Sequence, residues 1–474
     1  MSYELVIGLE THVELSTESK IFCSCGGHSA AKEPNDCVCP ACSGMPGMLP
    51  VMNKRVVELA VTAGLMLNCE ISRYTTFDKK NYYYPDLPCA YQITQLNHPI
   101  CTNGCVTIKT SGGNRDIRIK QIHMEEDAGK LVHGGKSSFV DFNRTSVPLI
   151  EIVTQPDFRS AEEVVTYLNK LKSMFRLGGI SECEEGAMRC DVNISIRPEG
   201  STEFGVRTEI KNMASFEAIE KAIRYEAQRH MDALDFGTEE LVQETRRFDD
   251  VSGKTFAMRN KETEADYRYF PDANLMPIII DDEWLEQIKA NKPVAVDEKA
   301  EEYREAGIFD KEIDMLLASH KIAKLLDDIV ALGCDAKDGA AWILTDCAGI
   351  LRKDGKTLGE LAITPEKLSA IIKMVDEGKI NRGAGKKILI AVIEEDVDPV
   401  AFCAQQGLDR KVDTSMIEQI IDRVMADHPQ AIEDYKNGKT KAAQALFGAC
   451  MKELKGAGDP AVIKELLEEK LKNA

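Results

Sequence analysis

Residues 5–15 read L-V-I-G-L-E-T-H-V-E-L, and this stretch decides how the first domain is interpreted. Successive side chains of a β-strand point to opposite faces, so Glu10, His12 and Glu14 share one face while most apolar side chains share the other. Two carboxylates and an imidazole at this spacing can converge on a cation without a loop folding around it. A half-exposed strand with a solvated face produces the same pattern. The functional interpretation therefore depends on whether later strands repeat it.

Three later segments carry polar side chains with the same period of two. The polar faces comprise Arg189, Asp191, Asn193, Ser195 and Arg197 in the first, Arg207, Glu209 and Lys211 in the second, and Gln121, His123 and Glu125 in the third. A face that is only solvated usually mixes Thr, Lys, Glu and Gln, whereas the residue types found here bind Mg²⁺ and phosphate. The sequence therefore predicts a mostly antiparallel sheet that packs one face on helices and lines an open, charged trough with the other.

The candidate Mg²⁺ ligands come from two of these strands and from one isolated carboxylate. Glu151 interrupts the apolar run V-P-L-I-E-I-V, where it needs a cation or a proton. Mg²⁺ prefers carboxylates together with nucleotide phosphates, so the predicted ligand set is Glu10, His12, Glu125 and Glu151. Arg189 and Lys211 are available to offset phosphate charge. His12 is equally well explained as a hydrogen-bonded structural histidine.

A second polar constellation lies in residues 77–91, F-D-K-K-N-Y-Y-Y-P-D-L-P-C-A-Y. The adjacent lysines Lys79 and Lys80 stand beside three tyrosines and two prolines, which suggests a rigid loop that offers ammonium groups and aromatic faces. Most pairs of lysines are simply solvated, and the spacing alone favours that explanation.

The cysteines Cys23-Ser-Cys25 and Cys39-Pro-Ala-Cys42 form two close pairs with thirteen residues between them. Two thiolate pairs joined by a loop are typical of a tetrahedral zinc site, and four thiolates would leave no open position for a water molecule. The expected zinc is therefore structural. Cys37 is a fifth thiol in the same region, so the choice of four ligands stays open.

The composition is that of a globular protein with reduced thiols. The 474 residues are enough for two to four domains, 43% of them are hydrophobic, and no apolar run is long enough to span a membrane. Fifteen cysteines in a chain without a secretory leader suggest a cytoplasmic location. The net charge of −19 argues against a general electrostatic attraction to nucleic acid. The segment 408–474 is nearly neutral, and an RNA contact is expected there first.

Three parts follow one another along the chain. Residues 1–292 are rich in predicted strands and contain two helices, whose N-caps are predicted at Ser160 and Ser215. Residues 293–407 have the periodicity of helices, and residues 408–474 form a small helical tail. The fold class is therefore α+β, with a sheet domain, a helical domain and an all-α tail domain.

Taken together, the motifs resemble the B subunits of tRNA-dependent amidotransferases over nearly the whole chain. The resemblance rests on V-I-G-L-E-T-H-V-E-L, K-N-Y-Y-Y-P-D-L-P, H-M-E-E-D-A-G-K, D-F-N-R-T-S-V-P-L-I-E-I-V, E-G-A-M-R-C-D-V-N-I-S-I-R-P and D-Y-R-Y-F-P-D. It implies a catalytic cradle related to the glutamine synthetase fold in residues 1–292. The cradle would bind ATP and Mg²⁺ and phosphorylate the side-chain carboxylate of Glu-tRNA(Gln) or Asp-tRNA(Asn), and ammonia would then displace phosphate.

The resemblance also implies roles for individual residues. Glu10, His12, Glu125 and Glu151 match the metal-binding positions of the family, and Cys23, Cys25, Cys39 and Cys42 match its zinc-binding pairs. On this hypothesis phosphate charge is neutralised by Lys79, Arg189 and Lys211. Substrate or a metal-bound water is oriented by Asp191, Asn193 and Ser195. The enzyme class is a ligase that forms carbon–nitrogen bonds with glutamine as the amide donor.

The expected partners follow from what the sequence lacks. No glutaminase motif is recognisable, so the family resemblance implies that ammonia comes from a partner amidase (the A subunit), joined by a small third protein (the C subunit) in a heterotrimer. The resemblance implies that misacylated tRNA contacts the tail through Lys436, Lys439, Lys441, Lys452 and Lys455. Without the resemblance, the residues themselves favour a solvated helix face. Two other functions remain open: a stand-alone ATP-dependent carboxylate–amine ligase for a small molecule, and a non-catalytic zinc-containing tRNA-binding module.

Overall fold

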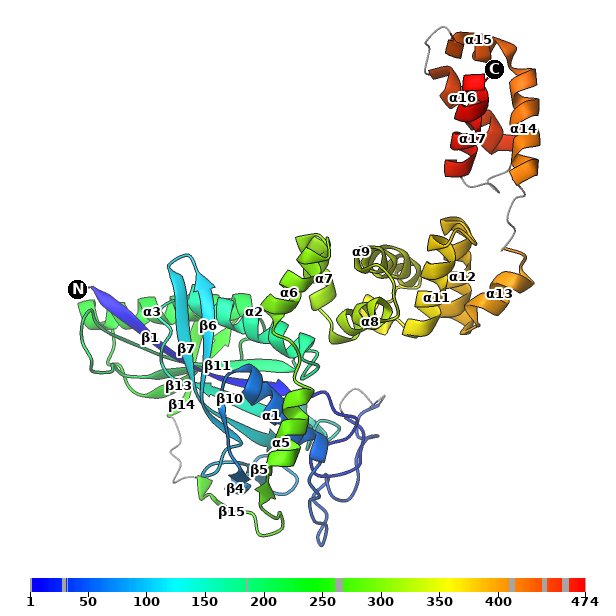
Figure 1. Ribbon diagram of the computed structural model, residues 1–474. Coiled ribbons are helices and arrows are strands. Elements are labelled where there is room, and N and C mark those ends of the chain that lie inside the picture. The colour runs from blue at the N-terminus through cyan, green and yellow to red at the C-terminus, as the bar shows by residue number, and fades with distance from the viewer. Residues whose placement is uncertain are drawn as a thin grey trace. The chain divides into compact units, whose positions relative to one another are not determined.

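The computed structural model describes residues 2–27, 31, 33–184, 186–260, 267–408, 414–436, 441–453 and 460–473. The fold is mixed α+β, with one large mixed sheet and many helices (Figure 1). The chain divides into two compact units, Met1–Glu302 with Leu317–His320, and Tyr303–Leu316 with Lys321–Ala474. The α+β class predicted from the sequence is confirmed at this level.

The large sheet has nine strands in the order β14-β13-β12-β11-β1-β10-β7-β6-β2. Their bounds are β1 Tyr3–Glu14, β2 Glu70–Ile71, β6 Cys101–Thr110, β7 Gly113–Glu126, β10 Pro148–Thr154, β11 Met188–Pro198, β12 Thr208–Lys211, β13 Glu244–Asp249 and β14 Lys254–Asn260. Neighbouring strands pair antiparallel except β12 and β13, which are parallel. The first predicted strand therefore lies near the centre of the sheet, between β10 and β11.

Three helices contact the apolar side of this sheet: α1 (Lys54–Met66), α2 (Ala161–Leu177) and α3 (Phe216–Phe236). Figure 1 shows α2 and α3 side by side along the sheet. Both helices begin where the sequence predicts, because Ser160 accepts the Glu163 N–H and Ser215 accepts the Ala218 N–H. One core contains Val164 and Leu168 of α2, Ile219 and Ile223 of α3, and strand residues such as Ile7, so the opposite face of the sheet is left for polar side chains.

The register of the central strands brings the predicted polar faces together. On β1, His12 pairs with Glu151 of β10 on one side and with Arg189 of β11 on the other. Glu10 pairs with Asp191 of β11 in the same antiparallel ladder. Side chains of directly paired residues lie on the same face, so the polar faces of these strands are continuous.

Several shorter strands and the helix α5 also belong to the first unit. They are β3 Tyr74–Thr75, β4 Asp78–Asn81, β5 Tyr91–Thr94, β8 Lys130–Gly134, β9 Ser137–Asp141, β15 Phe270–Pro271, β16 Ile278–Ile279 and α5 Asp282–Ala290. The strand β4 pairs with both β5 and β15, so the predicted lysine and tyrosine loop is anchored on two sides.

The remaining elements are helices, as the periodicity predicts. They are α6 Val296–Glu305, α7 Asp310–Leu317, α8 His320–Ala331, α9 Ala336–Ala341, the π-helix η2 Trp342–Cys347, α10 Ala348–Lys353, the 3₁₀-helix η3 Leu358–Glu360, α11 Pro365–Asp376, α12 Arg382–Glu395 and α13 Pro399–Gln405. The helical periodicity predicted for residues 293–407 is confirmed by these elements.

The C-terminal segment forms its own small core. Its helices are α14 Thr414–Asp427, α15 Pro429–Lys436, α16 Lys441–Glu453 and α17 Pro460–Asn473, and Ile421, Leu446 and Ile463 are buried among them. Of the five tail lysines, Lys439 and Lys455 lie outside the described residues, the side chains of Lys436 and Lys441 are not described, and Lys452 is exposed. Throughout the described part of the chain, no helix is both long and apolar enough to cross a membrane.

Candidate functional site

A cavity of about 640 Å³ opens on the polar side of the large sheet. Its walls come from β1, β7, β10, β11 and β12 together with the β4 segment. The lining side chains that carry charge or can do so are His12, Lys80, Glu125, Asp127, Glu151, Arg189, Asp191 and Lys211. The predicted trough therefore exists, and several of the predicted site residues line it.

One group of side chains in this cavity is built around His12. Its Nε2 lies 3.5 Å from Glu125 Oε1 and 3.4 Å from Glu151 Oε2, so an imidazole and two carboxylates face a common point. His123 Nε2 lies 3.0 Å from the same Glu151 oxygen. One nitrogen and two carboxylate oxygens suit a hard divalent cation that keeps further positions for water or phosphate.

The charges of this group are strongly coupled. Burial alone would lower the pKa of His12, but the charges of Glu151 and Glu125 outweigh it and raise that pKa to about 9. The same carboxylates raise the pKa of His123 to about 10. In return, the two histidines hold the pKa of Glu151 well below its usual range despite its burial. They also lower the pKa of the buried Glu125, so both carboxylates of the group are ionised at neutral pH. His12 is protonated at that pH and has to lose its proton before its Nε2 can bind a cation.

A second acidic group lies next to the first. Carboxylate oxygens of Glu10, Asp191 and Glu209 lie within 4.8 Å of one another. Lys211 Nζ donates to Asp191 and lies 3.3 Å from Glu209 Oε1. The structure therefore separates Glu10 from the three ligands with which the sequence grouped it. The distance along β1 explains why: Glu10 shares a face with His12 but lies two residues, about 6.6 Å, further along the strand, where it pairs with Asp191 of β11.

Two neutral side chains orient the carboxylates of the second group. Asn193 donates its side-chain N–H to Glu10 Oε1 at 2.9 Å, and Thr245 donates its hydroxyl to Glu209 Oε2 at 2.8 Å. Sequence reasoning placed Glu209 on a polar strand face without assigning it to the site, and it missed Thr245. The parallel pairing of β12 and β13 puts Glu209 and Thr245 in register, and no local sequence pattern predicts that pairing.

The two adjacent lysines point to different surroundings. Lys80 lines the cavity, and its Nζ lies 4.8 Å from the ring centroid of Tyr267 and 5.5 Å from that of Tyr82. Lys79 does not line this cavity, and its Nζ lies 3.8 Å from the buried Asp272 and 4.3 Å from the ring centroid of Tyr91. Consecutive residues of a strand face opposite sides, so only one of the pair can face the cavity. The prediction singled out Lys79, whereas the structure puts Lys80 on the wall.

Only some of the polar residues predicted on β11 line the cavity. Arg189 lines the cavity and donates to Asp127 Oδ2 at 2.7 Å, while its buried Nε has no hydrogen-bond partner among the described residues. Ser195 is buried further along the strand and does not line the cavity. Arg197, beyond it, donates to Glu4 instead.

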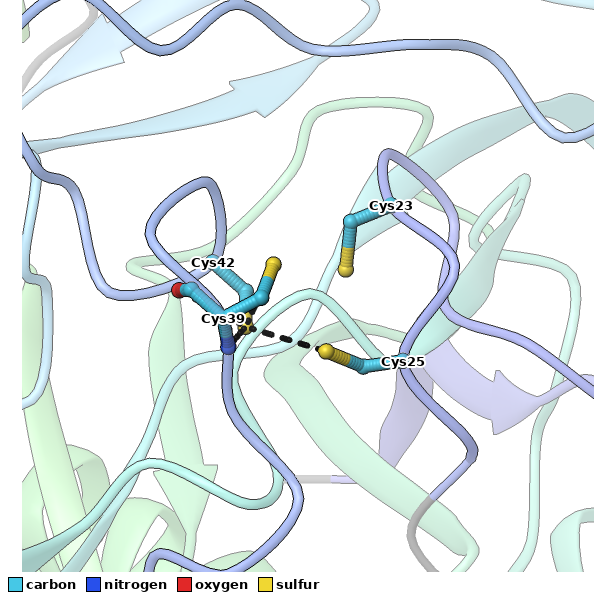
Figure 2. A group of neighbouring side chains, drawn as sticks. All are labelled: Cys23, Cys25, Cys39 and Cys42. Atoms are coloured by element: carbon cyan, nitrogen blue, oxygen red, sulfur yellow. Dashed lines mark hydrogen bonds between the residues drawn. The ribbon is translucent and has the colours of Figure 1, made fainter.

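The four predicted zinc ligands lie together although two segments supply them. Sulfur atoms of Cys23, Cys25, Cys39 and Cys42 all lie within 4.8 Å of one another. Figure 2 shows the pair from the first segment facing the pair from the second. Cys42 Sγ lies 4.0 Å from Cys25 Sγ and 3.8 Å from Cys39 Sγ, and it accepts the Cys39 N–H at 3.2 Å. The contact between Cys23 and Cys42 lowers the pKa of Cys42 to about 4 and raises that of Cys23, and burial raises the pKa of Cys25. In the absence of a metal, the negative charge of the group is therefore centred on Cys42.

The structure also settles which cysteine stands apart. Cys37 Sγ donates to the Gly26 carbonyl at 3.4 Å, and the Cys37 N–H donates to the Asn143 side chain at 2.9 Å. Cys37 is therefore outside the group of four. Four cysteine sulfurs around one point are the ligand type and the ligand number of a tetrahedral zinc site.

A smaller cavity of about 230 Å³ lies between the cysteine cluster and the end of β7. Glu126 lines it, accepts hydrogen bonds from Ser146 Oγ at 2.6 Å and Ile93 N–H at 2.9 Å, and has its pKa raised to about 7 by burial. The sequence did not single out Glu126, because the alternation along this strand puts it on the face opposite Gln121, His123 and Glu125.

The fold and this site define a class: α+β proteins with two acidic groups and several basic side chains converging on the polar face of a mixed sheet. Family comparison is more specific. Residues 5–286 match the GatB/GatE catalytic domain, and residues 324–471 match the GatB domain.

Whole-chain relatives agree with the domain matches. The chain is 45% identical to the B subunit of the aspartyl/glutamyl-tRNA(Asn/Gln) amidotransferase of Caldicellulosiruptor saccharolyticus over 99% of both chains. It is 46% identical to the protein of the same name from Lachnospira eligens over 99% of both chains, and 43% identical to that of Thermodesulfovibrio yellowstonii over the full length of both. The chain therefore belongs to the family of aspartyl/glutamyl-tRNA amidotransferase B subunits, which confirms the resemblance seen in its motifs.

Proposed function

We propose that the cavity carries out the ATP-dependent amidation of Glu-tRNA(Gln), Asp-tRNA(Asn) or both. As a member of the B-subunit family, the chain is part of a glutamine-hydrolysing amidotransferase complex. The observation that carries the finer proposal is one open cavity lined by the first acidic group, by Asp191 of the second, and by three basic side chains, Lys80, Arg189 and Lys211. Such a cavity is suited to a polyanionic nucleotide together with divalent cations.

The proposed reaction has two steps. A carboxylate is a poor acyl donor, so one of its oxygens first attacks the γ-phosphorus of ATP, and ADP leaves. Ammonia then attacks the carbonyl carbon of this acyl phosphate, phosphate leaves with the former carboxylate oxygen, and a proton is lost to give the amide. Phosphoryl transfer of this kind depends on positioning and charge neutralisation more than on a protein nucleophile.

Each group of side chains has a task in this scheme. His12, Glu125 and Glu151 would hold Mg²⁺, which when bound supplies positive charge to the phosphates. Lys211, Arg189 and Lys80 offset the remaining phosphate charge from the cavity walls. Asn193 fixes the orientation of the neighbouring Glu10 carboxylate. The positions of Lys79 and Ser195 outside the cavity lining support an indirect role for those two residues.

We also propose that the four clustered cysteines hold one structural zinc ion. Four thiolates fill a tetrahedral coordination sphere and leave no place for substrate. The cluster lies in the segment that leads into α1, so the metal would fasten this loop to the sheet domain. A role in catalysis is not needed to explain it.

The proposed partners complete the reaction. Ammonia would come from the amidase, the A subunit of the complex. A small C subunit would complete a cytoplasmic heterotrimer, and the tail domain would contact the tRNA. The relationship to the glutamine synthetase fold belongs to the same proposal, and the open antiparallel trough supports it.

A direct assay tests the proposed function. The chain is co-expressed with candidate A and C subunits, and the complex is incubated with each misacylated tRNA, ATP, Mg²⁺ and glutamine. We expect amidation by the wild type, and a loss of about a hundredfold or more in Glu125→Gln, because one carboxylate charge of the metal group is removed. The exposed Glu286→Gln is the matched control and should act like the wild type.

Two outcomes would contradict the proposal. Amidation of a free amino acid without tRNA would indicate a small-molecule ligase. Binding of tRNA without any Mg²⁺-dependent ATP turnover would indicate a non-catalytic binding module. Wild-type turnover by Glu125→Gln would refute the metal assignment while leaving the overall activity in place.

A further inference from the structure

A fully buried lysine lies against the cysteine cluster. Lys20 has an exposed fraction of 0%, and its Nζ lies 3.6 Å from Cys42 Sγ and 3.3 Å from the Phe142 carbonyl oxygen. Among the described residues it forms no ion pair with a carboxylate. Lysines are rarely buried so completely unless they are paired with an anion. The group in contact that can carry negative charge is the Cys42 sulfur.

The charge of a metal–thiolate cluster explains why a cation is buried here. A zinc ion bound by four thiolates carries a net charge of about −2, and this charge is costly to place away from water. An ammonium group that donates to one of the sulfurs offsets part of the charge and is itself stabilised by the contact. Lys20 and the cluster therefore compensate each other's desolvation.

Backbone hydrogen bonds at Lys20 and Ile21 hold the lysine next to the cysteine cluster. The Lys20 N–H donates to the Cys25 carbonyl at 2.9 Å, and the next residue, Ile21, donates to the Ser146 carbonyl at 2.9 Å. The lysine thus stands between the cysteine cluster and the segment 142–146, which leads into β10. That segment contacts the sheet end through the hydrogen bond from Ser146 Oγ to Glu126.

We propose that Lys20 is the buried counter-ion of the cluster. Its ammonium donates to Cys42 Sγ and to the Phe142 carbonyl, and so it strengthens metal retention and fastens the cluster to the segment 142–146. The inference rests on the proposal that the cluster holds zinc. It assigns a positioning role to a side chain outside the ligand set and outside the large cavity.

Metal retention by the full-length chain tests this role. Zinc content is measured first, and transfer of zinc to a chromogenic chelator is then followed in Lys20→Met, which keeps the length of the side chain and removes its charge. We expect Lys20→Met to hold zinc about tenfold to a hundredfold more weakly than the wild type, as is usual when an outer partner of a metal ligand is removed. Lys20→Arg, which keeps the charge, should recover part of the loss. The exposed Lys54→Met is the control and should match the wild type.

The possible outcomes distinguish the proposed zinc site from the proposed role of Lys20. A wild-type chain that binds no zinc overturns the zinc assignment and the role of Lys20 together. A wild type that holds zinc and a Lys20→Met variant that holds it equally well overturn the role of Lys20 alone.

A second measurement uses the wild type and covers the case in which Lys20→Met fails to fold. Hydrogen exchange of the amides in 142–146 is compared with and without bound zinc. Faster exchange after zinc removal is expected, because the ammonium then loses the charge that holds it between the two segments. Unchanged exchange in this segment would refute the proposed tether.

Discussion

At the scale of single residues, the cavity depends on ionised groups that stabilise one another. Lys211 shows this most clearly, because its Nζ contacts both Asp191 and Glu209 and the charges of these carboxylates outweigh its burial and raise the pKa of the lysine. Its ammonium is therefore charged at every physiological pH. The type of this residue was predictable from the strand pattern, but its partners were not.

Lys211→Met tests the proposed charge neutralisation. We expect kcat for amidation to fall by about a hundredfold, because removing one well-placed cationic or donor group from a developing negative charge has effects of that size. KM for the tRNA should change little. The exposed Lys324→Met serves as the control. A normal kcat in Lys211→Met would show that the lysine only balances the carboxylates beside it.

Glu226 gives a prediction about pH. It has an exposed side-chain fraction of 0%, and burial alone would raise its pKa, yet hydrogen bonds from His230, Arg229 and Thr255 outweigh burial and lower that pKa to about 2. Arg246 also lies 3.2 Å away. A carboxylate with a lowered pKa stabilises the fold above its unfolded pKa of about 4.5, and this stabilisation disappears as the pH falls toward 2.

The expected contribution of Glu226 at neutral pH is about 3 kcal/mol, and most of it should be lost by about pH 2. Urea unfolding at several pH values measures it as the difference between the wild type and Glu226→Gln. The difference should shrink steadily below about pH 4.5. A difference that stays constant from about pH 7 to about pH 2.5 would show that the carboxylate charge is not the source of the stability.

At the scale of elements, the strand β13 connects the far part of the sheet to the cavity. It is the parallel neighbour of β12, and Thr245 on β13 donates to the buried Glu209. The alternation of residues predicted the faces of individual strands correctly. It could not predict which strand lies beside which, because strand order depends on packing between distant segments.

Thr245→Val removes this hydrogen bond and keeps the shape of the side chain. The Glu10, Asp191 and Glu209 group could hold a second cation. If it does, we expect the Mg²⁺ concentration for half-maximal amidation to rise about tenfold, since the buried Glu209 loses its donor and its fixed orientation. Thr245→Ser should restore the wild-type value. Thr107→Val, which removes an exposed hydroxyl–carboxylate bond on β6, is the matched control. An unchanged Mg²⁺ requirement would argue against any role of Glu209 in cation binding.

At the scale of the whole molecule, the sheet domain and the C-terminal helices each have an apolar core of their own. The core of the sheet domain contains no described residue beyond Ile288, whereas the core formed by α14 to α17 runs from Ile417 to Leu471. The three-part division at 292 and 407 stays a prediction, and these separate cores support it. The chain can therefore be shortened at residue 407 without opening the sheet domain.

Deletion of residues 408–474 tests the proposed tRNA contact. We expect KM for charged tRNA to rise and its dependence on salt to weaken, because lysine contacts to phosphates are lost. ATP binding, measured by calorimetry on the same truncated complex, should be unchanged. Equal tRNA dependence before and after truncation would contradict a role of the tail in binding.

The sequence by itself determined the polar strand faces, the caps of α2 and α3, the helical character of residues 293–407, the two cysteine pairs and the family. Such features depend on residues that are near one another along the chain, where the period of a strand or the spacing of a motif is visible. Only the tertiary structure decided that Glu10 belongs with Asp191 and Glu209, that Lys80 faces the cavity in place of Lys79, and that Cys37 stands apart. It also decided that Lys20 is buried at the cysteine cluster. These arrangements follow from strand order and register, which are fixed by the packing of residues far apart in the chain.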